Sequence, residues 1–292
     1  MTADADGVVT VAAPAKINLY LHVTARRDDG YHELDSLMAF ADFGDVLEAE
    51  RGDGLSIRAT GTFAAEMPED DENLAVRAAR RLAEAAGVAP NAALTLNKAI
   101  PVAAGLGGGA SDAAATLKAL CALWNIPDGA VDLPAIALEL GADVPVCLHG
   151  RAAFVGGIGE KIDPAPPLPD AGLLLVNPGV KLATQAVFEK RRGGFTPAHP
   201  FDRTPATAID LARLLKDREN DLTESAVRMC PVIKDVLVAL EKVPGCHLAR
   251  MSGSGATCFG LFDTLEAAAA AASAVREKTW WVRPTRLALK PA

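Results

Sequence analysis

A run of glycines near the middle of the chain constrains the fold more than any other feature of the sequence. Four glycines fall within positions 105–109, and a helical pattern follows them directly. Each would cost about 1 kcal/mol inside a helix, so the run belongs where backbone approaches another group closely. Unpaired N–H groups and the positive end of the next helix favour an anion there. The run predicts a phosphate-binding loop; the alternative is an ordinary turn with Ser111 as the helix N-cap.

The type of phosphate loop is narrowed by what surrounds the glycines. No Gly-Lys-Ser/Thr follows, so the loop is not a Walker A motif. Residues 105–110 satisfy the loose pattern G-x-G-x-x-A of dinucleotide folds, which also require an acidic residue about 20 positions later at the end of a strand. Position 125 is Asn, and Asp128 lies in a Pro-Asp-Gly turn after a helix. The context therefore argues against a dinucleotide site.

A second cluster of small residues, Ser252-Gly253-Ser254-Gly255-Ala256-Thr257, lies between two short predicted strands. Such a cluster is most simply a hairpin loop. Paired with the first glycine loop, it could instead close over a phosphoryl group. Both interpretations stay open at this point.

The N-terminal segment from Val9 to Val23 alternates as a strand does. Its odd positions are apolar, whereas Lys16 and Asn18 share the opposite face with Tyr20 and His22. A lysine and an asparagine side by side in the middle of a strand are unusual, which makes them candidates for a functional site.

Asp143 follows a predicted helix that ends at Gly141. A carboxylate is disfavoured at the negative end of a helix dipole, so solvent or a nearby cation should compensate it. Lys16 is the candidate cation, and a solvated loop position is the alternative.

The pattern of predicted elements indicates an α+β fold in two domains. Helices are expected at 74–86, 113–124, 133–140, 206–215, 220–243 (divided by Pro231) and 265–278. Strands are expected at 9–23, 34–50 (one or two), 52–62, 93–102, 172–179, on either side of 252–257, and from 279 onward. Residues 142–157 are expected to form a loop followed by a strand. A proline-rich run at 163–170 is the best boundary, so the predicted domains are 1–163 and 164–292.

Charge and composition exclude several classes of protein. With a net charge of −8, the chain is a poor candidate for binding nucleic acid. Its longest stretches without a charged residue are 13 residues, at 85–97 and 99–111, short of the ~18 expected of a membrane span. The five cysteines include no C-x-x-C pair and the histidines show no metal-ligand spacing. The N-terminus lacks a secretory signal, so we expect a cytoplasmic protein.

Three segments in this order resemble the motifs of the GHMP kinase superfamily, which includes galactokinase, homoserine kinase and mevalonate kinase. They are Pro14-Ala15-Lys16-Ile17-Asn18, the stretch from Pro101 to Ser111, and Ser252-Gly253-Ser254-Gly255-Ala256. Asp29-Gly30-Tyr31-His32-Glu33-Leu34 and Leu140-Gly141-Ala142-Asp143-Val144-Pro145-Val146 narrow the resemblance to a branch that acts on a cytidine diphosphate-linked alcohol. The resemblance extends from about Ala12 to the last strand.

The resemblance implies a two-domain α+β fold, with an N-terminal ATP-binding domain and a ferredoxin-like C-terminal domain. It implies ATP-dependent phosphorylation of the 2-hydroxyl of a methylerythritol group, a step of non-mevalonate isoprenoid synthesis. Asp143 would accept the hydroxyl proton, and Lys16 would keep Asp143 ionised and steady the phosphoryl group. ATP phosphates would be bound by Pro101, Val102, Ala103, Ala104, Gly105, Leu106, Gly107, Gly108, Gly109, Ala110 and Ser111, with Ser111 as a ligand of the Mg²⁺ that accompanies ATP.

The same resemblance assigns a substrate site. Tyr31 and His32 would meet the cytosine, one by stacking and one by hydrogen bonding, and Phe188 would supply the other aromatic wall. The remaining substrate residues would be Asn18, Thr184, Gly253, Ser254 and Gly255. Position 38 is Met, where some relatives have an aromatic residue. Ala110 and Asp112 stand where Ser and Asn are common, and Asp112 would be either exposed or a further contact to Mg²⁺.

Two alternatives remain. One is a GHMP-type kinase of another small alcohol, such as homoserine or a mevalonate-type compound. The other is an inactive relative that binds nucleotide without turnover. In each case the expected partner is a small molecule rather than nucleic acid or a membrane, and the chain is expected to be a monomer or a homodimer.

Overall fold

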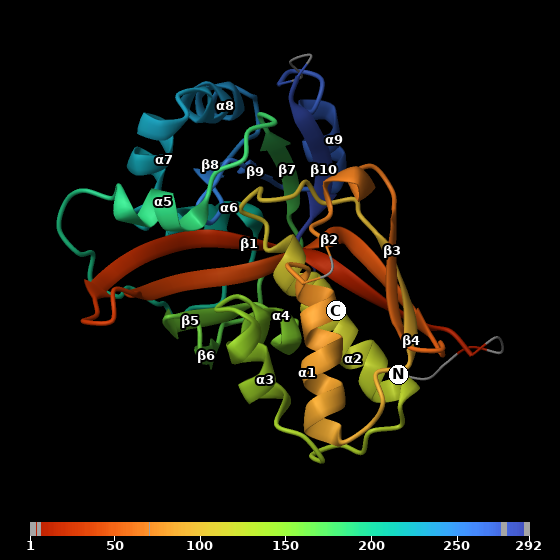
Figure 1. Ribbon diagram of the computed structural model, residues 1–292. Helices are drawn as coiled ribbons and strands as arrows, with labels where there is room; N and C mark the ends of the chain where they lie inside the picture. Colours follow the sequence, from red (N-terminus) through yellow and green to blue (C-terminus); the bar gives the residue numbers. More distant parts are fainter. Residues whose placement is uncertain (1–3, 5–6, 70, 276–278, 289–292) are drawn as a thin grey trace.

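The computed structural model describes residue 4 and residues 7–69, 71–275 and 279–288 of the chain. Within them lie two largely antiparallel sheets, and the first contains a long ribbon of two strands that crosses the centre of the molecule (Figure 1). These strands are β1 (Val9–Arg26) and β2 (His32–Glu50), which pair antiparallel from end to end. The segment expected to hold one or two strands is therefore a single long one.

The first sheet is arranged around β2, which pairs with a different neighbour at each of its ends. Its order is β3-β4-β2-β5-β6, with β1 on the other side of β2. Only β3 and β4 run parallel within it. The four shorter strands are β3 (Leu55–Thr60), β4 (Ala92–Asn97), β5 (Ala153–Gly157) and β6 (Lys161–Pro164).

Helices gather on one side of this sheet, below the β1–β2 ribbon in Figure 1. They are α1 (Leu74–Ala86), α2 (Gly108–Leu123), α3 (Leu133–Leu140) and α4 (Val144–His149), and a short 3₁₀ turn, η1, covers Ala64–Glu66. The predicted ends of α1 are confirmed. The side chain of Asn73 accepts a hydrogen bond from the N–H of Ala75, and Gly87 closes the helix in the left-handed conformation.

The C-terminal part has the strand order of a ferredoxin-like fold. Its four antiparallel strands lie in the order β10-β7-β9-β8, so the last strand pairs with the first. They are β7 (Gly172–Asn177), β8 (Leu248–Met251), β9 (Cys258–Phe262) and β10 (Trp281–Arg286). The resemblance therefore predicted this part correctly.

The helices of this part pack around its sheet. They are α5 (Thr184–Glu189), α6 (Ala208–Leu215), α7 (Thr223–Met229), α8 (Val232–Glu241) and α9 (Leu265–Ala271). Pro231 separates α7 from α8, as its missing N–H predicts. The alanine-rich helix is shorter than expected, since α9 ends at Ala271, and residues 276–278 lie outside the described residues.

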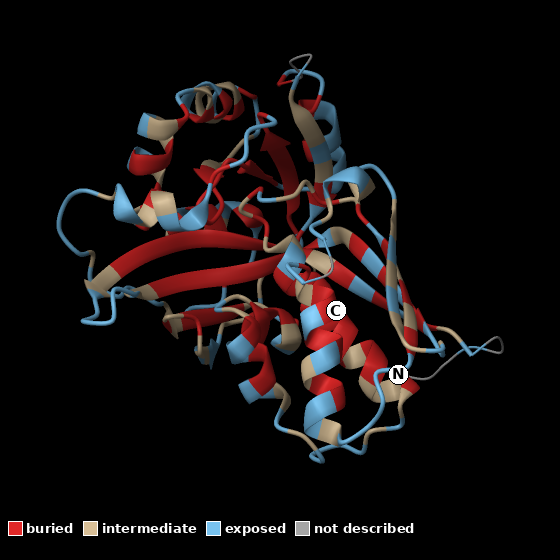
Figure 2. Cartoon of the chain, viewed as in Figure 1, coloured by how far each residue is buried: buried red, intermediate tan, exposed pale blue. Residues whose placement is uncertain are grey.

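Strand β1 contributes to each of the three hydrophobic clusters found among the described residues. Its first apolar residues, such as Val11, pack with α1 and α2; Ile17 and Leu19 pack against the C-terminal sheet; Val23 packs with the C-terminal helices. Figure 2 shows the ribbon buried through its middle. Because apolar neighbours cover both of its faces, polar side chains in this stretch are removed from water and must find partners inside the protein.

The two-domain α+β interpretation agrees with this architecture. The proposed division after residue 163 falls close to the end of β6 and stays a prediction, since the middle cluster takes residues from both sides of it. No helix in the described part of the chain has the length and apolar character needed to cross a bilayer.

Candidate active site

A buried pair of polar side chains on β1 forms the centre of the candidate site. Lys16 donates from Nζ to Oδ1 of Asn18 at 2.8 Å, which confirms that the two share one face of the strand. Both are almost fully buried. A register shift between Asn18 and Tyr20 ends the predicted alternation, and Tyr20 joins the apolar cluster of Ile17 instead of continuing the polar face.

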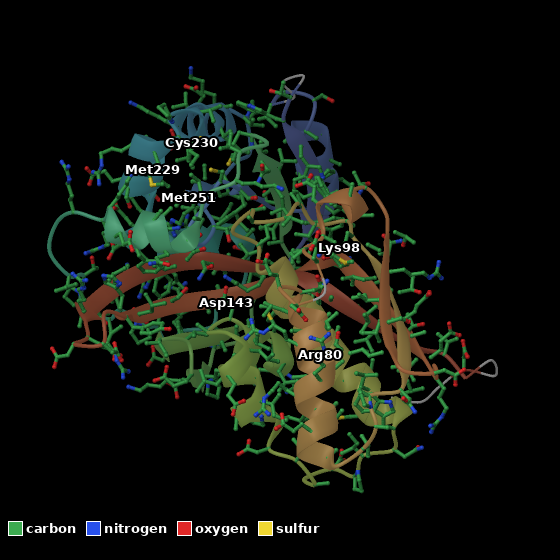
Figure 3. All side chains as sticks on the ribbon, viewed as in Figure 1. Arg80, Lys98, Asp143, Met229, Cys230 and Met251 are labelled. Atoms are coloured by element: carbon green, nitrogen blue, oxygen red, sulfur yellow. The ribbon has the colours of Figure 1, made fainter. Side chains whose placement is uncertain are left out.

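Asp143 lies beside the β1–β2 ribbon (Figure 3), and its Oδ2 is 3.0 Å from Nζ of Lys16. The lysine side chain is 4% exposed and the carboxylate 40%. A buried ammonium needs a counter-charge, whereas the carboxylate keeps one side open to solvent and to any substrate. The structure thus brings together the two residues predicted to be catalytic.

The surroundings of Asp143 differ from the sequence prediction. The segment after it was expected to be a loop, but Val144–His149 forms α4, and Asp143 occupies its N-cap position. A single short helical turn is too brief to show a hydrophobic period, which is why the sequence pattern missed it. Asp143 is therefore not only at the end of α3 but also at the start of α4, where a negative charge is favoured.

The glycine loop packs directly on Lys16. The N–H of Lys16 donates to the carbonyl of Leu106 at 2.8 Å. A Cβ on Gly107 would lie 3.0 Å from Cε of Lys16, and Gly107 has a φ of +64°. Any side chain at position 107 would therefore displace the lysine or strain the backbone. The glycine is required where the loop meets the ammonium group.

Helix α2 begins at the loop, so the free N–H groups of its first turn belong to the segment predicted to bind phosphates. Gly107 is the N-cap, and Ser111 is already the fourth residue of the helix. The alternative in which Ser111 caps the helix is wrong: its hydroxyl donates to the carbonyl of Pro14 at 2.6 Å and so ties α2 to β1.

The two glycine-rich loops touch each other through backbone groups and the hydroxyl of Ser252. Ser252 donates from Oγ to the carbonyl of Gly105 at 2.9 Å, and the N–H of Thr257 donates to the carbonyl of Ala104 at 3.1 Å. A Cβ on Gly105, whose φ is +76°, would lie 2.5 Å from the carbonyl oxygen of Ser252. The second loop is more than a hairpin turn, because it forms one wall of the first.

Asn220 holds the second glycine loop in place and was not predicted from the sequence. Its buried side-chain amide donates to the carbonyls of Met251 and Gly253, each at 2.8 Å, and its Oδ1 accepts from the N–H of Leu222. In the sequence, Asn220 is notable only for its position just before α7. An asparagine at the start of a helix is usually interpreted only as an N-cap.

A buried group of charges behind the glycine loop was also missed. Nζ of Lys98 is 2.6 Å from Oδ2 of Asp112 and forms a second ion pair with Asp45, whose Oδ1 accepts from two backbone N–H groups. Burial raises the pKa of Asp112 against the attraction of Lys98. The expectation of an exposed Asp112 is wrong, and its carboxylate is directed to Lys98.

The predicted cytosine-binding residues gather at the far end of the ribbon. The rings of His32 and Phe188 stack with their centroids 5.1 Å apart, while Tyr31 is 59% exposed. Burial, followed by the positive charges of Arg26 and Arg191, lowers the pKa of His32. The lowered pKa favours the neutral imidazole, which carries one donor and one acceptor nitrogen.

The other predicted substrate residues have clear neighbours. The hydroxyls of Thr184, at the start of α5, and Ser254, in the second glycine loop, are 2.9 Å apart. Met38, on β2, is buried in the N-terminal core.

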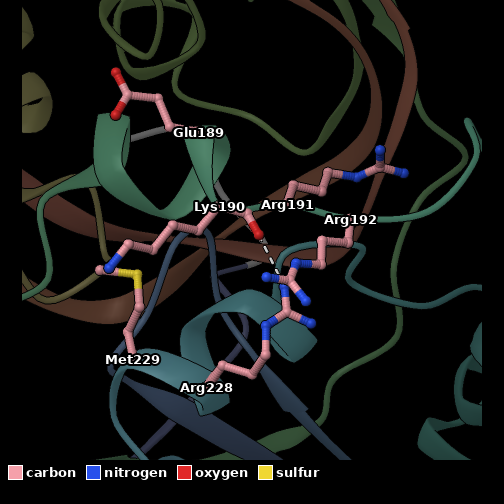
Figure 4. Close-up of a pocket in the computed structure, with 6 residues that line it drawn as sticks. All are labelled: Glu189, Lys190, Arg191, Arg192, Arg228 and Met229. Atoms are coloured by element: carbon pink, nitrogen blue, oxygen red, sulfur yellow. Dashed lines mark hydrogen bonds between the residues drawn. The ribbon is translucent and has the colours of Figure 1, made fainter.

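A basic pocket lies between α5 and α7, next to the aromatic pair. Its volume is about 440 Å³, and Figure 4 shows the six residues that line it, Glu189, Lys190, Arg191, Arg192, Arg228 and Met229. Arg228 forms an ion pair with Glu224 and also donates to the carbonyl of Lys190. Four cationic residues here stand out in a chain whose net charge is −8.

Comparison with known proteins places this geometry in a family. The model of the GHMP kinases N terminal domain matches residues 73–151, and that of the GHMP kinases C terminal domain matches residues 205–279. A relative from Rhodospirillum rubrum, named 4-diphosphocytidyl-2-C-methyl-D-erythritol kinase, is 53% identical over 285 residues, which cover 97% of this chain and 93% of the relative. The chain belongs to the GHMP kinase family. The predicted enzyme class, an ATP-dependent small-molecule kinase, is thereby confirmed.

Solved structures of GHMP kinases support the same fold. A crystal structure of 4-(cytidine 5'-diphospho)-2C-methyl-D-erythritol kinase superposes with a TM-score of 0.79 at 39% identity, covering 96% of this chain and 99% of that one. A homoserine kinase from Cytophaga hutchinsonii superposes with a TM-score of 0.69 at 18% identity, covering 99% of this chain and 97% of that one. The second likeness shows the fold alone.

Proposed function

We propose that the chain phosphorylates the 2-hydroxyl of 4-(cytidine 5'-diphospho)-2-C-methyl-D-erythritol with ATP. The observation that carries the proposal is the contact between Lys16 and Asp143 beside the two glycine loops. The names of the most similar relatives support the choice of alcohol. The homoserine and mevalonate alternatives rest on fold likeness only, which does not define a substrate.

Asp143 is the proposed general base. Its carboxylate takes the proton of the substrate hydroxyl as the oxygen forms a bond to the γ-phosphorus of ATP. The bond between that phosphorus and the β,γ-bridging oxygen breaks, and ADP leaves with its electron pair. Such a base contributes about 10²–10⁴-fold to the rate. The partly exposed position of Asp143 is compatible with this role, since the group must reach a hydroxyl.

Lys16 and the glycine loop are proposed to stabilise the transferred phosphoryl group. The loop from Pro101 to Ser111 offers backbone N–H groups and the start of α2, and Lys16 adds a fixed positive charge. Positioning and charge stabilisation are the main catalytic contributions in phosphoryl transfer.

Mg²⁺ is proposed to enter with ATP instead of occupying a site made by the protein alone. No group of three or more His, Cys, Asp or Glu side chains within the described ranges could hold a metal ion. Asp112 is held by Lys98, and the hydroxyl proton of Ser111 is used by Pro14, so Ser111 has only its oxygen lone pairs to offer. Mg²⁺ usually keeps several waters and binds through phosphates, where it neutralises their charge.

The end of the ribbon is the proposed cytidine site. Tyr31 is exposed and able to stack on a base, and neutral His32 offers the hydrogen-bonding groups that a cytosine edge requires. Phe188 already stacks on His32, so it supports that imidazole as well as offering an aromatic wall. Thr184, Gly253, Ser254 and Gly255 complete the proposed substrate site. Asn18, expected to line it, is fully buried and is proposed to act through Lys16 instead.

The deciding experiment measures ADP release from ATP and Mg²⁺ with three alcohols in parallel. The proposal expects turnover with the cytidine diphosphate-linked methylerythritol and little with homoserine or mevalonate. Equal turnover of another alcohol would show a different kinase. Binding of ATP without turnover of any alcohol would indicate the inactive relative.

A further inference from the structure

Asn18 is the most constrained polar residue of the candidate site. It is fully buried, and both ends of its side-chain amide are hydrogen bonded. Nδ2 donates to Oγ of Ser36 at 2.9 Å, and Oδ1 accepts from Nζ of Lys16 at 2.8 Å. Its backbone N–H donates to Oγ of Ser252 at 3.2 Å. An amide that contacts the lysine must present its oxygen, since an NH₂ group would place donor against donor.

Ser36, on β2, favours the same orientation of the amide from its other end. It is fully buried, and its hydroxyl donates to the carbonyl of Tyr20. A serine hydroxyl has a single proton, and a carbonyl oxygen can only accept. With that proton used, Oγ can only accept from Asn18. The NH₂ group must therefore lie on Ser36, which leaves the amide oxygen facing Lys16.

The consequence reaches the reacting groups through Lys16. Its ammonium group has three N–H donors, and two are directed to Asn18 and Asp143. These two contacts fix the direction of the third. We propose that Ser36 is a positioning residue of the kinase: it orients Asn18, and through Asn18 it holds Lys16 against Asp143 with one donor directed at the phosphoryl group. The inference rests on the proposed function for the identity of that group.

Ser36→Ala tests the inference by removing the acceptor for the asparagine amide. The buried NH₂ group then lacks a partner, so Asn18 should rotate and release Lys16. We expect kcat to fall about 10- to 100-fold, the cost of a small misplacement at a reacting centre. The KM values for ATP and for the alcohol should stay within about twofold of the wild type. Ser36→Thr keeps the hydroxyl and should restore most of kcat.

Ser225→Ala is the matched control. Ser225 is also buried, and its hydroxyl also donates to a backbone carbonyl, that of Leu222 in α7. Both alanine variants should lose thermal stability, Ser36→Ala somewhat more because it also leaves the amide of Asn18 unpaired, whereas only Ser36→Ala should lose kcat. Equal kcat in both, or a loss in Ser36→Ala that Thr does not restore in a folded protein, would overturn the positioning role.

A crystal structure of Ser36→Ala separates this inference from the proposed function. The inference expects the distance between Nζ of Lys16 and Oδ1 of Asn18 to exceed hydrogen-bonding range, or the amide to have turned. Failure of the wild type to phosphorylate the cytidine alcohol would refute the proposed function, while the rearranged pair would still support the positioning role. An unchanged pair in Ser36→Ala would refute the positioning role whatever the substrate.

Discussion

The ammonium group of Lys16 lies 3.0 Å from the carboxylate of Asp143, although Lys16 lies on the first strand and Asp143 is the N-cap of the fourth helix. One partner is buried and the other is half open, so the pair joins a fixed charge to an accessible base. This asymmetry suits proton removal from a bound alcohol.

Replacing Asp143 with asparagine keeps the shape of the side chain and removes the base. We expect kcat to fall at least about 100-fold, with little change in affinity for ATP, whose proposed site is the glycine loop. Steady-state ADP release and nucleotide titration measure the two effects. Glu139→Gln on α3 removes a carboxylate from an exposed ion pair and should leave kcat unchanged. Turnover of Asp143→Asn within a few-fold of the wild type would rule out its role as the base.

Shortening the proposed aromatic walls should weaken binding of the cytidine substrate. Tyr31→Ala and Phe188→Ala should chiefly raise the KM for that substrate, by about 10-fold or more, because each removes a stacking surface worth about 1–3 kcal/mol per base. The KM for ATP serves as the internal control. An unchanged KM for the cytidine substrate in both variants would end the stacking proposal.

The pH dependence of binding should follow His32. Burial and nearby arginines lower its pKa below the ordinary value of 6.5, so the neutral form predominates above that pH and is lost only as pH falls further. The KM for the cytidine substrate should therefore stay flat from about pH 8 to 6.5 and rise below it. Arg26→Gln removes one positive charge and should move the rise to higher pH. A rise that begins above pH 7 in the wild type would contradict this assignment.

Lys98 should be important for stability. Lys98→Met leaves the buried carboxylates of Asp45 and Asp112 without their cation, and the free energy of unfolding should fall by about 3–5 kcal/mol. Adding Asp112→Asn should recover part of the loss, because it removes one of the two charges. Arg80→Met breaks an exposed pair with Asp71 and should change stability little. Urea denaturation measures all three, and an unaltered midpoint in Lys98→Met would contradict the expectation.

The basic pocket next to the aromatic pair should attract the anionic substrate. The double charge reversal of Lys190 and Arg192 to glutamate should lower kcat/KM for the cytidine substrate about 10-fold at low ionic strength. The difference should shrink as salt screens the charges. Lys234→Glu on α8 makes a charge change of the same kind elsewhere and should have a smaller effect. A loss that does not depend on salt would argue against electrostatic attraction.

Local patterns predicted much of this molecule correctly. The alternation of β1 placed Lys16 and Asn18 on one face, and the glycines before α2 marked the loop that packs on them. These inferences needed only the geometry of a strand and the conformational freedom of glycine. The helix-end argument named Lys16 as a candidate partner of Asp143, but only the family resemblance implied that the two meet, since no local pattern brings distant segments together.

The features that the sequence patterns did not predict were missed for physical reasons. Helix α4 is too short to show a hydrophobic period, so the prediction placed Asp143 only after the end of α3 and missed that it also begins α4. Lys98, Asp45 and Asp112 lie in three different segments of the sequence, and charged residues usually lie on the protein surface. Only their mutual pairing makes burial tolerable, and that pairing exists only in three dimensions.

The course of β1 through all three hydrophobic clusters has a consequence for how the chain folds. The residues of β1 pack in the cores of both halves. If β1 detached from one half, it would also expose apolar surface in the other. The two halves should therefore unfold together in one cooperative transition, despite their separate sheets. The same strand carries Lys16 and Asn18, so the candidate site should be lost in the same transition that unfolds the whole chain. A partly unfolded kinase would then have no intact site.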